Sequence, residues 1–291
     1  MARKELGLRV WSRPLFLQNT LTFQRFAFGK SSSDKFLLAV FFLSAFLLWL
    51  SWIAGSKGLE GLKNLPFASL IGYCSIFVVL GRIEASTFLT SRDIFFIGGL
   101  SVLFAIPQNT IMAFVFTTIG FLLISKNDRN IVSLGQICIG LAWIDVWGPF
   151  LLVTIEDWLL RFEALIAFMP LKLFGEYKLV GTAIYGNSDH SVIIYAPCSA
   201  FNNTVRSAFI WLCLIKLCDF RPAVWQIYGL IASLFGIIVL NCGRIGLMAT
   251  SFERYDYWHN GFGSSLYGYS MTFLVFSIFY FLAVKHQSDR R

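Results

Sequence analysis

Charged residues are scarce in this chain of 291 residues, and their scarcity excludes a soluble globular protein. Only 14% of the residues are Asp, Glu, Lys or Arg, whereas soluble domains carry roughly a quarter. Hydrophobic residues make up 57% of the chain, and no polar linker divides it. We therefore expect one all-α integral membrane domain with several transmembrane helices.

Motifs that mark several enzyme classes are missing. The sequence has no HExxH, no Gly-x-Ser-x-Gly and no Walker loop, which disfavours metalloprotease, serine hydrolase and nucleotide-driven functions. Its six cysteines form no C-x-x-C pair, so a disulfide framework is not expected. We predict no cofactor and no metal. The net charge of +8 comes from residues at the ends of apolar segments, which suits lipid headgroups and not nucleic acid.

The chain also lacks the pattern of a cleaved signal peptide, because the first apolar run begins only at Phe36. Residues 1–35 are basic and partly amphipathic, and we expect them to lie on the cytoplasmic membrane surface. Residues 36–284 form the predicted polytopic membrane domain, and residues 285–291 form a cytoplasmic tail.

Eight apolar stretches approach the roughly 20 residues that a helix needs to cross a bilayer. Only Pro107-Gln108-Asn109 separates the third stretch from the fourth, so these two could instead form one long kinked segment. The eight stretches are Phe36–Ala54, Pro66–Leu80, Ile94–Ile106, Thr110–Ser125, Ile131–Ile155, Ala200–Leu217, Ala223–Arg244 and Leu266–Val284.

The distribution of Lys and Arg predicts the orientation of these helices. With eight spans and a cytoplasmic N-terminus, the inner segments carry 16 of the 24 basic residues and the outer segments carry 8. Such an excess on the inner side is what membrane insertion favours. We therefore expect both termini in the cytoplasm, with loops 156–199 and 245–265 facing outward from the cell inner (plasma) membrane.

The first outer loop has two recognisable parts. Apolar residues from Trp158 to Met169 recur with helical spacing and predict an interfacial amphipathic helix. Two runs, Tyr177–Tyr185 and Ser191–Ala196, flank Gly186-Asn187-Ser188-Asp189 and predict a β-hairpin.

This topology brings three reactive residues to one membrane level. Cys198 lies where the sixth predicted helix begins, Arg244 where the seventh ends, and His259 in the second outer loop. A thiolate near a helix N-terminus or a cation is a competent nucleophile. A histidine can act as general acid and base, and an arginine can stabilise an oxyanion.

The motifs around these residues resemble the exosortase/archaeosortase family of membrane proteins, which carry Cys, Arg and His in that order. The matching stretches are Ala196-Pro-Cys-Ser-Ala, Asn241-Cys-Gly-Arg-Ile and His259-Asn-Gly-Phe-Gly, and the resemblance covers roughly residues 190 to 284. Ala200 departs from the glycine that the family often has after Cys-Ser. This difference affects the assignment to a subfamily more than it affects the expected chemistry.

The resemblance implies a membrane cysteine protease and transpeptidase with Cys198, Arg244 and His259 as catalytic residues. Its partners would be membrane-anchored proteins with a C-terminal sorting signal, which consists of a short motif, one transmembrane helix and a basic tail. Cys198 would attack near the outer membrane surface, and an unknown acceptor would release the acyl-enzyme.

Other interpretations of these residues stay open. Cys242 is a rival nucleophile and could pair with Cys198. His190 and Asp189 are expected in a solvated turn. His286 in the tail is expected to have no role. Asn202, Asn203 and Asn241 could bind a substrate backbone or pack helices.

The rival function is a transporter or a non-catalytic assembly factor for exported polymers. Its path would be lined by Asp145, Arg206 and Gln136, since ionisable groups in membranes mark function. Asp145 and Arg206 are also predicted to form an intramembrane ion pair.

Overall fold

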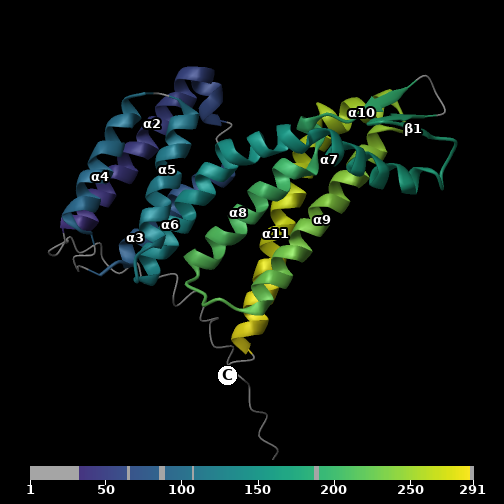
Figure 1. Cartoon of the computed structure of the whole chain (residues 1–291). Helices are drawn as coiled ribbons and strands as arrows, with labels where there is room; N and C mark the ends of the chain where they lie inside the picture. The colour runs from purple at the N-terminus through teal and green to yellow at the C-terminus, as the bar shows by residue number, and fades with distance from the viewer. Residues whose placement is uncertain (1–32, 64–65, 85–88, 107, 187–189, 289–291) are drawn as a thin grey trace, which may run out of the picture.

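The apolar stretches of the chain are helices in the computed structural model, which describes residues 33–288 except 64–65, 85–88, 107 and 187–189 (Figure 1). The interpretation of residues 1–35 therefore lies almost wholly outside the described residues. The helical elements are α2 (Ser33–Lys63), α3 (Phe67–Arg82), α4 (Ser91–Val102), η1 (Leu103–Ala105), α5 (Asn109–Ile124), α6 (Arg129–Ala142), η2 (Trp143–Trp147), α7 (Gly148–Leu171), η3 (Ala196–Cys198), α8 (Ala200–Leu217), α9 (Val224–Met248), α10 (Phe252–His259) and α11 (Phe262–Ser288).

Four helical segments are long and apolar enough to cross a membrane: Ser33–Gly55, Arg129–Leu171, Val224–Met248 and Phe262–His286. Between 22% and 39% of each most apolar window is buried inside the protein, so the remainder faces outward. Large apolar side chains on these outward faces, such as Phe235 and Phe273, are well exposed. Bilayer lipid is the solvent that such faces require, and the chain is therefore a helical membrane protein. The shorter apolar helices α3 and α5 leave the predicted count of eight spans unconfirmed.

The third and fourth predicted stretches form separate helices. The chain leaves helical geometry at Ile106, and α5 begins at Asn109. Because α4 and η1 both pack against α5, the chain reverses direction between η1 and α5 and does not continue as one kinked helix.

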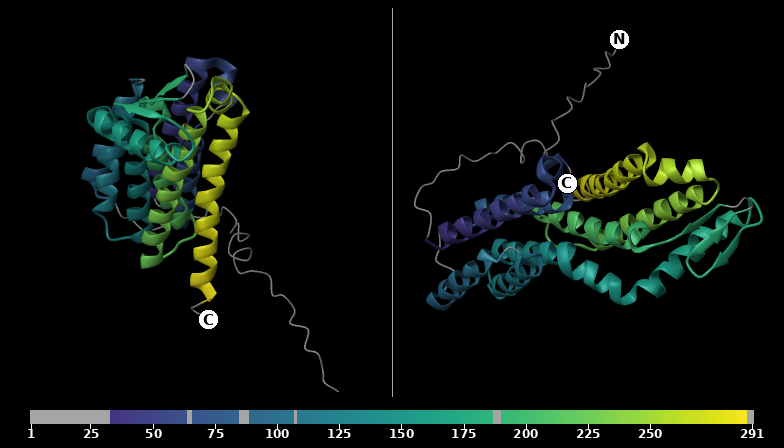
Figure 2. Two further views of the ribbon diagram at one scale, coloured as in Figure 1. Left: turned by 90° about the vertical axis from the view of Figure 1, so that its right-hand side faces the viewer. Right: turned by 90° about the horizontal axis from the view of Figure 1, so that it is seen from above.

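The fifth predicted stretch and the amphipathic stretch after it form one continuous helical segment of 43 residues, Arg129–Leu171. A π-helical turn at η2 interrupts it, followed at once by Gly148 and Pro149. Proline lacks the N–H that a helix interior needs, and π turns and prolines are known sites of helix bending. Figures 1 and 2 show the result: α6 runs with the bundle, whereas α7 crosses its end.

The predicted β-hairpin is a three-stranded antiparallel sheet of β1 (Lys178–Val180), β2 (Ala183–Tyr185) and β3 (Ser191–Ile193). The β2–β3 hairpin occurs where it was predicted, but the first run, Tyr177–Tyr185, is not one strand. It breaks at Gly181, whose φ of 62° starts a two-residue turn between Val180 and Ala183. Glycine tolerates this left-handed geometry, so the run folds back on itself.

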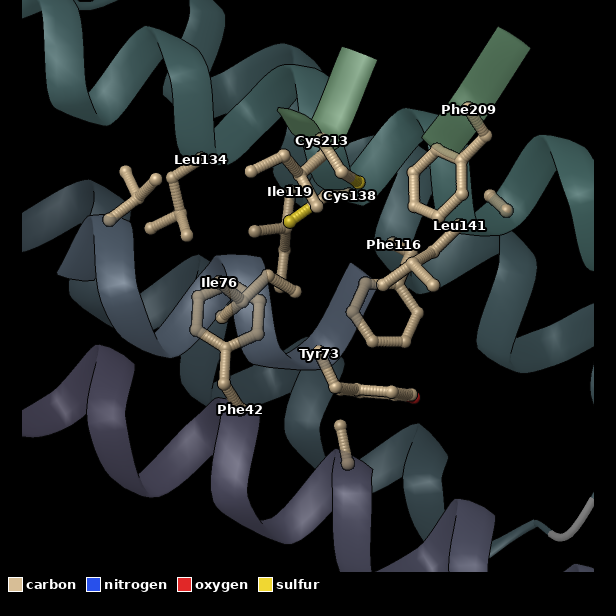
Figure 3. Close-up of a cluster of buried hydrophobic side chains, with 14 of the residues drawn as sticks. Phe42, Tyr73, Ile76, Phe116, Ile119, Leu134, Cys138, Leu141, Phe209 and Cys213 are labelled. Atoms are coloured by element: carbon tan, nitrogen blue, oxygen red, sulfur yellow. The ribbon is translucent and has the colours of Figure 1, made fainter. Parts of the chain in front are cut away.

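Buried apolar side chains form two clusters. The larger cluster lies among α2, α3, α5, α6 and α8, and Figure 3 shows its centre, where Phe42, Tyr73, Phe116 and Phe209 converge. The second, called the site cluster below, joins α7, the sheet, the start of α8 and the end of α9. It consists of Leu160, Ala164, Ala167, Phe168, Leu171, Ile184, Val192, Ile194, Cys198, Cys242, Ile245, Met248 and Ala249.

Contacts between loops and helix ends define the two ends of the bundle. At one end Lys126 pairs with Asp93 at 2.6 Å, and Arg129 pairs with Asp219 at 3.1 Å. Arg82 donates to the carbonyl of Lys216 at the same end. At the other end the sheet meets the end of α9, where His190 Nε2 lies 3.0 Å from the Met248 carbonyl oxygen.

Candidate functional site

Cys198 stands immediately before helix α8, as predicted. Its backbone N–H closes the turn of η3 by donating to the Tyr195 carbonyl at 2.8 Å. Ser199 then caps α8 by accepting a hydrogen bond from the Phe201 N–H at 3.0 Å. Cys198 is only 7% exposed and belongs to the site cluster. A reacting group must therefore approach the thiol through a narrow opening.

Glu163 on α7 holds the start of α8 in place. Its buried carboxylate accepts a hydrogen bond from Ser199 Oγ at 2.7 Å and from the Ala200 N–H at 3.0 and 3.1 Å. A carboxylate at a helix N-terminus satisfies free N–H groups and interacts favourably with the helix dipole. Glu163 thus fixes the backbone on the C-terminal side of Cys198. Sequence reasoning missed it, because the stretch from Trp158 to Met169 was interpreted only as an interfacial helix.

Asn241 fixes the backbone of Cys198 from α9. Its Nδ2 donates to the Cys198 carbonyl at 2.9 Å, and its Oδ1 accepts from the Tyr267 hydroxyl at 2.9 Å. Asn203 Nδ2 donates to the same hydroxyl at 3.4 Å. Asn241 is fully buried, so these bonds satisfy polar groups that water does not reach.

Arg244 does not end α9, as the apolar pattern predicted, but lies one turn inside it, since α9 continues to Met248. Its Nε donates to the Trp258 carbonyl at 3.0 Å, and its guanidinium lies 4.8 Å from the centre of the Tyr267 ring. The cation is therefore held between α10 and α11 by a hydrogen bond and a cation–π contact.

His259 lies at the C-terminal end of α10, a helix that sequence reasoning treated as part of a loop. Ser251 caps this helix, and His259 stacks on Tyr255 with ring centres 5.0 Å apart. The ring atom Nδ1 lies 2.9 Å from Asn260 Oδ1. The ring is half-buried, and no described contact occupies its Nε2 atom.

The three predicted residues lie at one end of the bundle, in η3, α9 and α10, and are linked through neighbours. Asn241 connects α9 to Cys198, and Arg244 connects α9 to Trp258, the residue before His259. Among the described contacts, no hydrogen bond or ion pair joins the three side chains directly.

The other predicted candidates take different places. Cys242 lies in the site cluster with Cys198, and both thiols are free. His190 is not in a solvated turn, because its ring contacts the Met248 carbonyl and packs against Tyr255. His286 packs against Trp225, near the helix ends opposite to the site. Asp189 lies outside the described residues.

The predicted ion pair between Asp145 and Arg206 is absent. The described carboxylate–cation pairs are Lys126–Asp93 and Arg129–Asp219, and neither includes Asp145 or Arg206. Asp145 instead accepts a hydrogen bond from Ser69 Oγ at 3.2 Å. Both charged side chains line a cavity, which is described below.

Comparisons of the chain with protein-family models, with curated proteins and with solved structures found no match.

Proposed function

We propose that this chain is a membrane cysteine peptidase and transpeptidase resembling the exosortases, with Cys198, Arg244 and His259 as its catalytic residues. The observation that carries the proposal is the network that ties the three motifs together. Asn241 binds the Cys198 backbone, and Arg244 lies over the Tyr267 ring that binds Asn241. Arg244 also donates to the Trp258 carbonyl, directly before His259. A network of this kind holds reactive groups in a fixed arrangement, which acyl transfer requires.

Each residue has a defined role in the proposed reaction. The Cys198 sulfur adds to the scissile carbonyl of the substrate, and Arg244 stabilises the oxyanion that forms. His259 takes the thiol proton and gives it to the leaving amine, which leaves a thioester on Cys198. A nucleophilic acceptor then attacks the thioester and restores the free thiol.

The substrate is proposed to be an exported protein with a C-terminal motif, one transmembrane helix and a basic tail. The candidate residues lie at one end of a helical bundle, so a membrane-anchored substrate can reach them sideways. Deleting the apolar helix of the substrate while keeping its motif should abolish processing. Efficient processing of the soluble form would contradict this mode of binding.

The proposal includes the finer topology of eight spans in the inner membrane, with both termini in the cytoplasm and the site outside. The grouping of Arg82, Lys126 and Arg129 at the end opposite to Cys198 supports this orientation.

The direct test is to trap a covalent adduct between the protein and a candidate substrate, and to locate it by mass spectrometry. The adduct should form on Cys198, and Cys198→Ala should abolish processing at normal membrane levels. Cys242→Ala is the matched control, because this second thiol lies in the same buried cluster. If Cys242→Ala is inactive and Cys198→Ala still processes substrate, the nucleophile is wrongly assigned.

A transporter or assembly factor is the second candidate function, and one observation favours it. Asp145 and Arg206 line a cavity within the bundle without pairing with each other, as residues on a transport path would. A transporter should tolerate the loss of the Cys198 thiol, whereas the enzyme should not.

A further inference from the structure

A cavity of about 420 Å³ lies between the N-terminal helices and the helices that carry the candidate site. In Figure 1 the first group, α2 to α6, lies on the left, and α8, α9 and α11 lie on the right. The walls of the cavity come from α2, α3, α5 and η2 on one side and from α8 and α11 on the other. Cys198, Arg244 and His259 are not among its lining residues, so the cavity is distinct from the candidate site.

The cavity contains two opposite charges that form no direct ion pair, although the Arg206 cation still interacts electrostatically with the Asp145 carboxyl. Asp145 on η2 and Arg206 on α8 both line it and are both exposed to it, yet they form no ion pair. The only hydrogen bond described for Asp145 comes from Ser69. Unpaired charges are costly within a membrane protein unless water or a ligand compensates them. A ligand with one anionic and one cationic group would compensate both.

In the proposed topology, the cavity lies close to the outer ends of the helices and so near the level of the lipid headgroups. Asp145 lies where the chain bends from α6 into α7, at the end of the bundle that α7 crosses. Arg206 lies six residues into α8, which is about 9 Å at 1.5 Å per residue. Trp49 and Trp52 also line the cavity, and tryptophan is enriched at this membrane level.

The size of the cavity limits its occupant. An α-helix is 10–12 Å wide with side chains, so about 420 Å³ accommodates roughly one helical turn and not a transmembrane segment. A phospholipid headgroup is smaller, and its acyl chains could extend along the exposed apolar surfaces of the neighbouring helices.

We infer that this cavity binds the headgroup of a zwitterionic phospholipid, with its phosphate against Arg206 and its ammonium against Asp145. The guanidinium of arginine matches a phosphate in geometry, and a carboxylate matches an ammonium in charge. The inference does not depend on the proposed catalytic activity. Asn203 lines the cavity and donates to Tyr267 in the site network, so a bound lipid would also contact the wall that supports Cys198.

The test measures lipid retention by the full-length protein in neutral detergent with native mass spectrometry. Phosphatidylethanolamine, which carries both charges, is compared with phosphatidylglycerol, which has the phosphate but no ammonium. The wild-type protein should retain phosphatidylethanolamine on the order of tenfold better. Asp145→Asn should remove this preference, and Arg206→Gln should weaken the retention of both lipids.

Matched controls change charge outside the cavity. Asp157→Asn and Arg161→Gln lie on the exposed face of α7 and should retain both lipids like the wild type. Asp145→Glu and Arg206→Lys keep the charges and should keep part of the preference, even if the neutral variants fold poorly. Equal retention of the two lipids by the wild-type protein would overturn the inference. Competition by free phosphoethanolamine as strong as by the whole lipid would identify a soluble ligand instead, and would also overturn it.

Discussion

Glu163 is the residue whose role is clearest from the structure alone. Its buried carboxylate holds Ser199 and the first N–H of α8, directly after Cys198. Loss of a helix N-cap costs about 0.5–2 kcal/mol, and unsatisfied buried donors add to that cost. We therefore expect Glu163→Ala to lower the melting temperature and the processing rate.

Glu163→Gln distinguishes positioning from simple stabilisation. Glutamine keeps one oxygen that can accept from the Ala200 N–H, but it loses the negative charge at the helix N-terminus. This variant should recover most of the stability and part of the processing rate. Full activity of Glu163→Ala would show that the cap does not position Cys198.

Asn241 offers a second test at the residue scale. Asn241→Asp keeps the shape of the side chain and its bond from Tyr267, but it replaces the donor to the Cys198 carbonyl with an acceptor. Two oxygens would then face each other in a buried position, which costs about 1–3 kcal/mol. We expect folded but poorly active protein, measured by processing in membranes. Asn202→Asp is the control and should remain active, because this half-buried side chain takes no part in the described network.

The ionisation of Asp93 makes the stability of the folded protein depend on pH. Burial raises the pKa of the Asp93 carboxyl, but hydrogen bonds from Lys126 and Thr90 outweigh burial and hold the pKa below its usual value. A carboxyl with a lowered pKa stabilises the folded state at pH values above its unfolded pKa of about 3.9. That contribution disappears as the pH falls through the lower, folded pKa.

Melting curves in detergent can measure this contribution. Wild-type protein should be more stable than Asp93→Asn by a constant margin between about pH 5 and 7, and the margin should shrink below about pH 4. A margin that is independent of pH would show that the Asp93 charge contributes nothing. It would then reflect only the capping geometry at Thr90.

At the scale of elements, α5 and α6 approach each other closely through two glycines. A Cβ atom on Gly135 would lie 2.5 Å from the Gly120 carbonyl oxygen, which is backbone and cannot move aside. Small residues let membrane helices pack in this way.

Gly135→Ala should therefore destabilise the protein by about 1–3 kcal/mol, the usual cost of overpacking. Thermal unfolding in detergent measures it. Gly99→Ala on α4 is the control, because nothing lies within 4 Å of its added Cβ, and alanine favours a helix over glycine. Equal stability of the two variants would contradict close packing of α5 against α6.

The elements also show what apolar patterns can predict. The pattern placed α8 at Ala200–Leu217, which are its bounds in the structure, because polar or turn-forming residues flank an apolar run on both sides. It missed α10, whose residues Phe252–His259 are mostly polar and aromatic and gain their helix from the Ser251 cap and from packing. The break at Gly181 depends on one backbone angle, which an alternating pattern does not reveal.

Only those residues of the candidate site whose own side chains are reactive could be predicted from the sequence. Cys198, Arg244 and His259 have reactive side chains and could be selected from the sequence. Glu163 and Tyr267 act through contacts with residues that are 36 and 26 positions away, so only the folded chain reveals them. The predicted pair of Asp145 and Arg206 used helix depth alone, which does not specify the direction of a side chain.

At the scale of the whole molecule, the two ends of the bundle differ in charge and should face different compartments. Val180 on the sheet and Phe252 on α10 are well exposed at the end that holds Cys198. Arg221 and Asp128 are exposed at the opposite end, beside the Arg129–Asp219 pair. Cysteines introduced singly at these four positions, in a background without the native cysteines, therefore report the orientation of the molecule.

A membrane-impermeant thiol reagent added outside intact cells should label cysteines at positions 180 and 252. Positions 128 and 221 should react only after the membrane is permeabilised, because the excess of basic residues keeps that end in the cytoplasm. The reagent requires a solvated thiol, and all four positions are exposed, so protection reports the membrane and not burial. Labelling of positions 128 and 221 from outside would show that the molecule has the opposite orientation, with Cys198 in the cytoplasm. The proposed processing of exported proteins could not then occur at this site.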